Sequence, residues 1–558
     1  MDDNFNIGLT PLKGDKTFSF GTWDVEAADW WHLEMIGCWD GTEFFYFRKI
    51  EEFIRHILQH KYRGYRWFAH FGGRYDMNFI FDWLREKRRD VKVSFYCSGA
   101  MVLQMSLRYR GMTAKLCDSY RLFGVRDDSV RRDNQTGASL RALGIAFDVA
   151  HKKTEIDYTA IVFGPQLIEY NAQDCRCLYE VIERFFEETG VHSETFASHA
   201  LRVWRKDFLE QTIWKPHDEI LDFIRRGYHG GRVEVYKRTS PDLTCYDVNS
   251  MYPSVMMHPQ PVEYIGESHR LLDGDEFGFV ECIIDLPECY IPSLPIMKDK
   301  LYFPVGRLQG VWSSREVLEA ERRGAKIQKI IRAVYFKTAP IFRSYIEKLH
   351  KMKQTAKEPT RTIAKLLMNS LYGKFGQSPT KKVYYTESEA PDGSIPIILP
   401  NGVPSGFATF DRTSRSAYLL PHLASAVTSR ARLVLLDQLH DSIYYCDTDS
   451  VFTSHTMKTG PGLGEWSEVG RGAATFIQPK LYHFAGKWKS KGLDKEQSID
   501  DFVAGNPNLI HRARSIKEAL REGSASCAHV HIEKRLRETH PKRSWTGDDT
   551  RPWDMGEL

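Results

Sequence analysis

Two aspartates separated by one residue are the side chains of this sequence best placed to do chemistry. Asp447 and Asp449 lie in the stretch YYCDTDSV at 444–451, with apolar residues before and after. That pattern predicts two short strands with the acids at the turn between them. Carboxylates this close repel each other, and a cation between them would stabilise the arrangement. Taken alone, the tripeptide is explained equally well by a solvated, Asp-rich hairpin turn.

A third aspartate favours the metal explanation. Asp247 ends an apolar stretch and is followed by VNSMYPS at 248–254, which predicts a strand, a turn and a helix. A carboxylate at such a place lies beside backbone donors that can hold phosphate. Two carboxylate sites from distant parts of the chain suit a two-metal phosphoryl-transfer centre. One metal would activate the attacking hydroxyl, and both would neutralise charge on the phosphate.

A second set of acids occurs in the N-terminal third of the chain. Asp24 and Glu26 share one face of a predicted strand, which suits two carboxylates that bind one metal. Asp76 follows a Gly-Gly turn and precedes an amphipathic helix. Tyr170 and Asp174 lie one turn apart on another predicted helix. Together these acids predict a second two-metal site, in which water would cut a phosphodiester.

The order of the motifs resembles the family B (α-like) DNA polymerases. DVNSMYPS, KLLMNSLYGKFG and YCDTDS, beginning at 247, 365 and 445, resemble motifs A, B and C of that family. The acids of the N-terminal third resemble the three exonuclease motifs of proofreading polymerases. The resemblance covers about residues 18–495.

The resemblance implies an α+β multidomain fold. It consists of an N-terminal ribonuclease H-like 3′–5′ exonuclease domain followed by a right-hand polymerase with palm, fingers and thumb. The expected divisions are exonuclease 1–190, connector 191–240, first palm part with a possible insertion 241–340, fingers helical hairpin 341–378, second palm part 379–478 with an inserted hairpin at about 386–412, and thumb with C-terminal tail 479–558.

The resemblance also implies the metal sites. The expected polymerase ligands are Asp247, Val248 and Asp449, with Asp447 assisting nearby. The expected nuclease ligands are Asp24, Glu26, Asp76 and Asp174, with Tyr170 orienting the attacking water and Lys153 assisting. Two Mg²⁺ ions per site suit carboxylate and phosphate ligands, and Mn²⁺ could replace them.

A basic helical stretch is expected to bind the incoming deoxynucleotide. Arg361 and Lys365 lie one turn apart, and a triphosphate needs such cations to offset the leaving pyrophosphate. Without the neighbouring motifs, a solvated basic face would explain them better. By resemblance, Lys365 is the main group on the triphosphate and Tyr252 excludes a 2′-hydroxyl. The expected nucleotide contacts are Tyr252, Lys353, Arg361, Lys365, Asn369, Tyr372 and Gly373.

The remaining expected contacts are to DNA. Two adjacent glycines let a backbone approach a phosphate closely, and here they belong to a stretch that resembles the YxGG motif between the two halves of these enzymes. Tyr120 stands where the family prefers Leu, and an aromatic ring there could stack on a base. Phe71 stands where an Asn usually helps to hold the frayed primer end. The expected DNA contacts are Ser119, Tyr120, Tyr228, Gly230, Gly231, Arg432, Lys480 and Tyr482.

Composition limits the classes of protein to consider. The chain has 558 residues, enough for three or four domains, and its formal charge of +4 gives no global argument for a nucleic-acid partner. Its ten cysteines include no CxxC pair, which argues against a zinc ribbon and fits a reduced, cytosol-like compartment. No signal peptide or membrane span is predicted. We therefore expect a cytoplasmic monomer, in the host cytoplasm if the protein is viral.

The sequence thus predicts a DNA-templated DNA polymerase with 3′–5′ proofreading. Its expected partners are primer-template DNA, single-stranded DNA and dNTPs. The YxGG motif, the Lys353 and Lys365 pair and the inserted hairpin resemble the protein-primed group of phages and linear plasmids, which implies a terminal protein as primer. The alternatives are an enzyme that uses nucleic-acid primers or none, and a nuclease with a non-catalytic polymerase half. A non-enzymatic single-strand-binding protein would need a larger basic excess.

Overall fold

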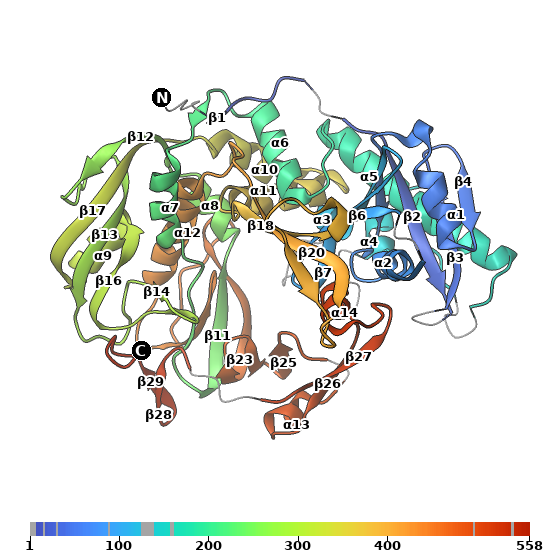
Figure 1. The fold of residues 1–558 in the computed structure, drawn as a ribbon. Helices are drawn as coiled ribbons and strands as arrows, with labels where there is room; N and C mark the ends of the chain where they lie inside the picture. Colours follow the sequence, from blue (N-terminus) through green and yellow to red (C-terminus); the bar gives the residue numbers. More distant parts are fainter. Residues whose placement is uncertain are drawn as a thin grey trace.

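The chain folds into two halves that meet across helices and an inserted sheet (Figure 1). The structure is a computed structural model. It describes residues 7–14, 17–28, 32–87, 90–123, 139–156, 161–494, 497–536 and 541–558. Within these ranges no helix is both long enough and apolar enough to pass through a membrane.

The N-terminal half is built on a ten-stranded sheet. In spatial order its strands are β19 (Ile395–Ile398), β20 (Pro404–Thr413), β18 (Thr380–Thr386), β6 (Lys92–Ser98), β7 (Met101–Tyr109), β8 (Met112–Asp118), β5 (Arg66–Ala69), β2 (Phe20–Ala27), β3 (Leu33–Trp39) and β4 (Phe44–Phe47). Strands β2, β5 and β8 run parallel to one another, and β3 runs antiparallel to β2. This arrangement is the expected ribonuclease H-like core.

Two helices place acids against that sheet. Helix α2 (Asp76–Lys87) begins at Asp76. Helix α5 (Pro165–Thr189) packs on β2 and β3. Proline at its first position and left-handed Gly190 after its last residue fix both ends of α5. The smaller helices of this half are α1 (Ile50–Ile57), α3 (Tyr120–Phe123) and α4 (Leu140–Ala146).

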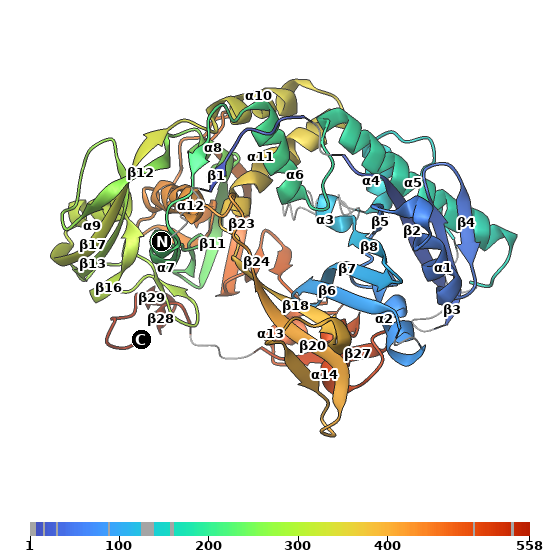
Figure 2. The same ribbon diagram turned by 45° about the horizontal axis from the view of Figure 1, so that its top comes forward.

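The segment that contains the insertion predicted at about 386–412 joins the ten-stranded sheet. Strand β18 pairs with β20 on one side and with β6 on the other, where Val383 lies opposite Tyr96. Figure 2 shows β18 and β20 between the nuclease strands and the rest of the molecule. The ring of Tyr384 stacks on Phe95 across this junction, with centroids 4.9 Å apart. The insertion therefore couples the two halves through backbone hydrogen bonds.

The C-terminal half, where the polymerase is expected, is built on a seven-stranded sheet. In spatial order its strands are β10 (Val233–Val235), β21 (Ile443–Asp447), β22 (Ser450–Thr453), β11 (Thr239–Val248), β23 (Trp466–Gln478), β24 (Leu481–Phe484) and β25 (Lys487–Ser490). Each neighbouring pair is antiparallel. The predicted pair of short strands around the 447–449 turn is therefore confirmed as β21 and β22.

A separate four-stranded sheet occupies the region where an insertion was expected. Its strands, in spatial order, are β12 (Gln260–Ser268), β17 (Lys326–Ala339), β13 (Phe277–Leu286) and β16 (Gly306–Ser313). Helix α9 (Ser314–Arg322) covers it and begins with a capping box between Ser313 and Glu316. Two shorter strands, β14 (Ile296–Met297) and β15 (Leu301–Tyr302), form a hairpin beside it.

Helices join the two halves through one large core. They are α6 (Phe196–Asp207), α8 (Met251–Met256), α10 (Arg343–Thr355), α11 (Thr360–Phe375) and α12 (Pro421–Leu436). Helix α7 (Asp218–Arg226) belongs to a separate buried cluster with residues of β13, β16 and β17. The largest buried cluster runs from α5 and α6 through α10, α11 and α12 to β21 and β22. Strands β1 (Gly8–Leu9) and β9 (Ile213–Trp214) pair on the outside of this core. Helices α10 and α11 lie in the range 341–378, where a helical hairpin was expected.

The C-terminal residues form small elements that reach both halves. They are α13 (Ile499–Val503), β26 (Asn508–Ala513), α14 (Ile516–Glu522), β27 (His529–Lys534), β28 (Ser544–Thr546) and β29 (Asp549–Arg551). After α14, the backbone N–H groups of Ser526 and Cys527 donate to Asp82 of α2. The β28–β29 hairpin lies instead beneath the polymerase sheet (Figure 1).

Candidate functional site

The polymerase acids come together at one edge of the seven-stranded sheet. Asp247 on β11 and Asp447 on β21 both lie opposite Ser450 of β22, one on each side of it. The N–H of Val248 donates to the carbonyl of Asp449 at 2.8 Å, which draws the turn toward β11. Antiparallel pairing therefore places three carboxylates, from two segments far apart in the chain, on neighbouring strand ends.

Thr448 gives the acidic turn its shape. It has a left-handed φ of 64°, which is costly for a β-branched residue. The carbonyl of Arg232 accepts a hydrogen bond of 2.7 Å from the Thr448 N–H and holds it there. A side chain at Gly231 would lie 2.7 Å from the Thr448 methyl group, so glycine is required at that position. The YxGG segment thus supports the turn directly.

The environment of Asp447 differs from the one expected for an accessory acid beside bound metal. Lys480 Nζ lies 2.6 and 2.7 Å from its two carboxylate oxygens, and the Tyr445 hydroxyl donates to it at 3.1 Å. Lys480, predicted to contact primer backbone, therefore pairs with an acid here. The ring of Tyr482 packs on Tyr445 with centroids 5.2 Å apart.

A stacked pair of tyrosines joins α8 to α11. The rings of Tyr252 on α8 and Tyr372 on α11 lie 4.5 Å apart at 23°. Both side chains are half-buried. The hydroxyl of Ser250, just before α8, accepts a hydrogen bond of 3.4 Å from Lys353 on α10. The predicted fingers helices therefore meet the residues that follow Asp247.

The expected nucleotide contacts on α11 share one face of the helix. Arg361, Lys365 and Asn369 follow at intervals of four residues, and Tyr372 and Gly373 continue the row. Arg361 is exposed to solvent, whereas Lys365, one turn further along α11, is half-buried. A side chain at Gly373 would meet no atom within 4 Å among the described residues.

The prediction that Arg432 contacts the primer is not consistent with its position. Its side chain is buried, with 4% of its surface exposed. It forms an ion pair of 2.8 Å with Glu316 on α9 and donates to the carbonyls of His229 and Gly230 at 2.6 and 2.9 Å. Arg432 therefore holds the YxGG turn from inside the core, because a buried guanidinium needs an acid and carbonyls around it.

In the YxGG segment, Tyr228 packs against the polymerase core, whereas Gly230 is exposed to solvent. The ring of Tyr228 packs against Gly376 at the end of α11, where a methyl group on the glycine would lie 2.6 Å from the ring. Gly230 is exposed, and a side chain there would meet no described atom within 4 Å. This turn thus presents backbone at Gly230 while Gly231 and Tyr228 fix it to the polymerase core.

The nuclease acids gather where β2, α2 and α5 meet. Asp76 accepts a hydrogen bond of 2.9 Å from the N–H of Val25, between Asp24 and Glu26. Asn171 on α5 donates to carboxylate oxygens of both Asp24 and Glu26 at 3.2 Å. Asn171 was not predicted as a site residue, although it is next to Tyr170 in the same motif and lies on the helix face that meets β2.

Burial and mutual repulsion change the protonation of these acids. Desolvation, followed by the charge of Asp174, raises the pKa of Asp24 to about 6. Desolvation and the charge of Asp24 raise the pKa of Glu26 to about 9. The pKa of Asp76 is also raised, first by burial and then by Asp24. Four neighbouring acids, three of them buried, are electrostatically unfavourable without cations.

Lys153 supplies one positive charge to the nuclease site. Its ammonium forms an ion pair with Asp174 and donates to the Tyr170 hydroxyl at 2.7 Å. The other carboxylate oxygen of Asp174 is buried and has no hydrogen-bond partner in the described part of the chain. The predicted association of Lys153 and Tyr170 with the nuclease acids is therefore present.

The chemistry of both acid sets fits hard divalent cations. Carboxylate and carbonyl oxygens are the ligands that Mg²⁺ prefers. Within the described ranges, however, no three His, Cys, Asp or Glu side chains converge as a ready-made ligand group. In this structure the ammonium group of Lys480 pairs with the carboxylate of Asp447, and that of Lys153 pairs with the carboxylate of Asp174.

An aromatic pair lies beside the nuclease acids. The ring of Phe71, just after β5, stacks on that of Tyr120, the first residue of α3, with centroids 4.3 Å apart. Phe71 has a left-handed φ of 61°, which is unusual for a bulky residue and common at functional sites. Ser119 hydrogen-bonds to His70 at 3.0 Å in the same place. The predicted stacking residue Tyr120 is therefore already paired with a ring.

Comparisons with known proteins agree with the motifs. Residues 149–395 match a family model described as DNA polymerase type B, organellar and viral. A protein named "Probable DNA polymerase" from Podospora anserina is 30% identical over 375 residues, 57% of this chain and 31% of that protein. The DNA-directed DNA polymerase of Enterobacteria phage PRD1 is 25% identical over 511 residues, 86% of this chain and 82% of that protein.

The fold agrees with that of a solved polymerase. The structure titled phi29 DNA polymerase complexed with primer-template DNA and incoming nucleotide substrates aligns with a TM-score of 0.69 at 18% identity. The alignment covers 93% of this chain and 99% of that one. The exonuclease-plus-right-hand fold is therefore confirmed. The chain spans only about a third of the length of the fungal relatives that it matches.

Proposed function

We propose that this chain, a relative of the organellar and viral type B DNA polymerases, copies a DNA template and removes nucleotides from the 3′ end. The meeting of Asp247, Asp447 and Asp449 at one sheet edge, beside helices that bear Lys353 and Lys365, carries the proposal. A chain that only bound DNA would not need three acids at the position of a phosphate, because carboxylates repel phosphate unless cations lie between them.

Asp247, Asp449 and the carbonyl of Val248 would hold the polymerase metals, with Asp447 beside them. Bound Mg²⁺ would make the primer hydroxyl a better nucleophile and neutralise charge on the transferred phosphate. In this proposal, Lys480 leaves Asp447 for the primer backbone when DNA is bound.

The fingers helices would position the deoxynucleotide. Lys365 and Arg361 would bind the triphosphate, with Lys353 in support, because cations there stabilise the leaving pyrophosphate. Asn369, Tyr372 and Gly373 would face the new base pair. Tyr252, backed by the ring of Tyr372, would exclude a 2′-hydroxyl from the sugar position.

The nuclease acids would form the second site. Asp24, Glu26, Asp76 and Asp174 would hold two divalent ions, whose charge offsets the repulsion among these buried carboxylates. Tyr170 and Lys153 would orient the attacking water and hold Asp174 in place.

We also propose that synthesis begins on a hydroxyl of a terminal protein. The insertion of β18, β20 and β19 and the YxGG segment support this, as does the match to the phage PRD1 protein over most of both chains. The 5′ ends of DNA made by the enzyme in its natural system should then carry covalently bound protein and resist a 5′→3′ exonuclease. Ends that are digested would instead support a nucleic-acid primer or unprimed initiation.

A single gel assay tests the two activities. A 5′-labelled primer on a longer template is incubated with the chain and Mg²⁺, with and without dNTPs. Lengthening with dNTPs and shortening without them is the expected result. Shortening in both lanes would favour a nuclease whose polymerase half is not catalytic.

A further inference from the structure

The acidic turn of the polymerase site is supported from behind by edge strand β10. Val233, Glu234 and Val235 of β10 pair with Asp447, Cys446 and Tyr445 of β21. The residue just before β10 is Arg232, whose carbonyl holds Thr448 between the two turn acids. Any element that fixes β10 and Arg232 therefore also fixes the acids.

Glu234 and Arg232 form a fully buried charged pair on this strand. Their side chains are 0% and 1% exposed, and Arg232 Nε donates to Glu234 at 2.6 Å. The Tyr236 hydroxyl donates to the same carboxylate oxygen at 3.0 Å. Arg232 also donates to the carbonyl of Pro292 at 2.7 Å. A buried ion pair depends on complete surroundings, because each partner is costly when left alone.

The C-terminal β28–β29 hairpin binds the end of β10 and the residues that follow it. The Thr550 hydroxyl donates to the carbonyl of Tyr236 at 2.8 Å, and the N–H of Arg238 donates to the carbonyl of Asp548 at 2.9 Å. Lys237 forms a β-bridge with Asp549. The edge strand of the polymerase sheet is thus bound by residues from the C-terminal end of the chain.

Arg543, just before β28, is the charged centre of this contact. Its side chain is 2% exposed, and its guanidinium lies over the rings of Tyr236 and Tyr290 at 4.6 and 4.9 Å. It donates to the Thr550 hydroxyl at 2.8 Å and to the carbonyl of Tyr290 at 2.9 Å. Burial works to raise the pKa of Glu234, and the charges of Arg232 and Arg543 bring it below its usual value. Arg543 is therefore a second cation for the buried acid.

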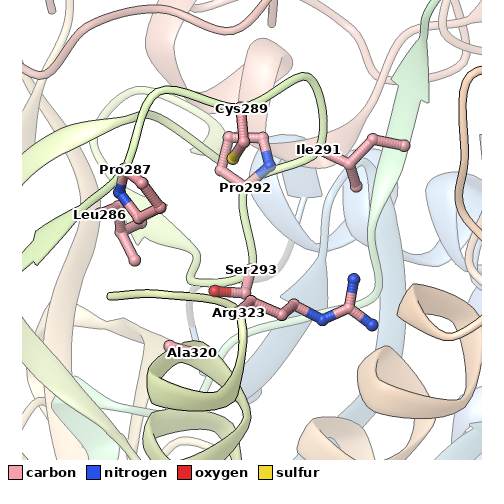
Figure 3. A pocket seen from close by; sticks show the side chains of 8 residues that line it. All are labelled: Leu286, Pro287, Cys289, Ile291, Pro292, Ser293, Ala320 and Arg323. Atoms are coloured by element: carbon pink, nitrogen blue, oxygen red, sulfur yellow. The ribbon is translucent and has the colours of Figure 1, made fainter. Parts of the chain in front are cut away.

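Both arginines bind the same loop. Arg543 donates to Tyr290 and Arg232 donates to Pro292, in the loop that Figure 3 shows from Pro287 to Ser293. The small cavity in that view is lined mainly by apolar side chains of the loop and of α9. The loop thus links the C-terminal segment to the residue that holds Thr448.

We propose that Arg543 is a positioning residue of the polymerase site. Together with Thr550 it fixes β10, Glu234 and Arg232, and through Arg232 it sets the turn that carries Asp447 and Asp449. It does not touch substrate, and the nuclease acids lie on other elements. Extension should therefore depend on Arg543 and Thr550, while 3′ degradation should not. This inference rests on the proposed polymerase function.

The test compares Arg543→Met with Arg543→Lys and with the matched control Arg551→Met. Arg551 lies on the same hairpin but is exposed and pairs with Glu557 at the surface. For each protein, kcat and KM for dNTP are measured in primer extension, along with the Mg²⁺ concentration that gives half-maximal rate. Degradation of single-stranded DNA without dNTPs is measured in parallel as the fold control.

Loss of a residue that orients metal ligands typically lowers activity about 10- to 100-fold. Arg543→Met should lower extension kcat by this amount and raise the Mg²⁺ requirement, with KM for dNTP and degradation unchanged. Arg543→Lys should recover part of the rate, and Arg551→Met should match the parent. An unchanged kcat and Mg²⁺ requirement in Arg543→Met would overturn the proposal, as would an equal loss of extension and degradation in a folded protein.

If Arg543→Met does not fold, Thr550→Val decides, because it removes only the hydroxyl between Arg543 and Tyr236. The proposal is supported if Thr550→Val lowers extension kcat, by less than is predicted for Arg543→Met, and leaves degradation unchanged. It is overturned if kcat and the Mg²⁺ requirement of Thr550→Val equal those of the parent. An absence of extension by the parent chain would mean that the proposed polymerase function, rather than the role of Arg543, has failed.

Discussion

At the scale of single residues, the acids of the proposed polymerase and nuclease sites differ in how far they are buried and in how their charge is compensated. The polymerase acids lie on strand ends at a half-exposed edge, where Lys480 pairs with one of them. The nuclease acids Glu26, Asp76 and Asp174 are buried, and Lys153 and Asn171 only partly compensate their charge. Divalent ions would therefore contribute to folding at the nuclease site as well as to chemistry.

The stack of Tyr252 on Tyr372 predicts the sugar selectivity of the enzyme. Tyr252→Ala leaves a space at the position proposed for the sugar, so ribonucleotides should be incorporated more readily. We expect the preference for dNTPs over rNTPs to fall by about 10- to 100-fold. The matched variant Tyr252→Phe keeps the ring and should keep the preference. Equal preference in Tyr252→Ala and the parent, measured as ratios of kcat/KM, would refute this role.

The stack of Phe71 on Tyr120 predicts how the nuclease holds a 3′ end. Stacking on a protein ring stabilises a bound base by about 1–3 kcal/mol. Tyr120→Ala should therefore raise KM for single-stranded DNA about 5- to 150-fold, with little change in kcat. Tyr46→Ala, at an exposed tyrosine on β4, is the control. A normal KM in Tyr120→Ala would exclude base stacking at this site.

At the scale of secondary-structure elements, the insertion is the feature with the clearest separate role. Strand β19 and the loop after it expose Ile395, Ile398 and Val403, while β18 and β20 complete the nuclease sheet. Thr386 lies opposite Phe407 in the β18–β20 pair. Replacement of residues 387–406 by Asn-Gly would therefore remove β19 and leave a two-residue hairpin.

We expect this shortened chain to add single nucleotides at the parental rate but to make short products. By resemblance, the insertion narrows the template path and supports processivity and strand displacement. Product lengths are measured with a trap that prevents rebinding, on open templates and on templates with a downstream strand. Parental lengths on both templates would show that β19 has neither role.

The elements that carry the motifs could be predicted from sequence, and their distant partners could not. Apolar residues next to the acids indicated the strands around Asp247 and Asp447, and the basic stretch that holds Arg361 and Lys365 indicated helix α11. No local pattern indicates that β18 pairs with β6, which lies in the distant N-terminal part of the chain. Arg432 was misassigned for the same reason, because its partner Glu316 lies far away in sequence.

At the scale of the whole molecule, the stability of the metal-free chain should depend on pH through the nuclease acids. Folding raises the pKa of Glu26 from 4.5 to about 9, so the folded state binds its proton more tightly than the unfolded state does. The resulting stabilisation is present below pH 4.5 and is lost as the pH rises toward 9. The melting temperature in EDTA should therefore fall over this range.

Addition of Mg²⁺ or Mn²⁺ should reverse most of that fall, because a bound cation favours the ionised carboxylates. Asp24→Asn combined with Glu26→Gln should melt at a higher temperature in EDTA and respond less to the metals. Melting temperatures that are independent of pH and of added metal in the parent would contradict cation binding by these acids.

The central claim is that one chain holds two separate phosphoryl-transfer sites. It is tested most directly by measuring extension and 3′ degradation, on the same labelled primer-template, in Asp449→Asn and in Asp24→Ala combined with Glu26→Ala. Asp449→Asn should lose extension by roughly 10²-fold or more and keep degradation. The double variant should lose degradation and keep extension. Retained extension in Asp449→Asn, or loss of both activities in either folded variant, would contradict the claim.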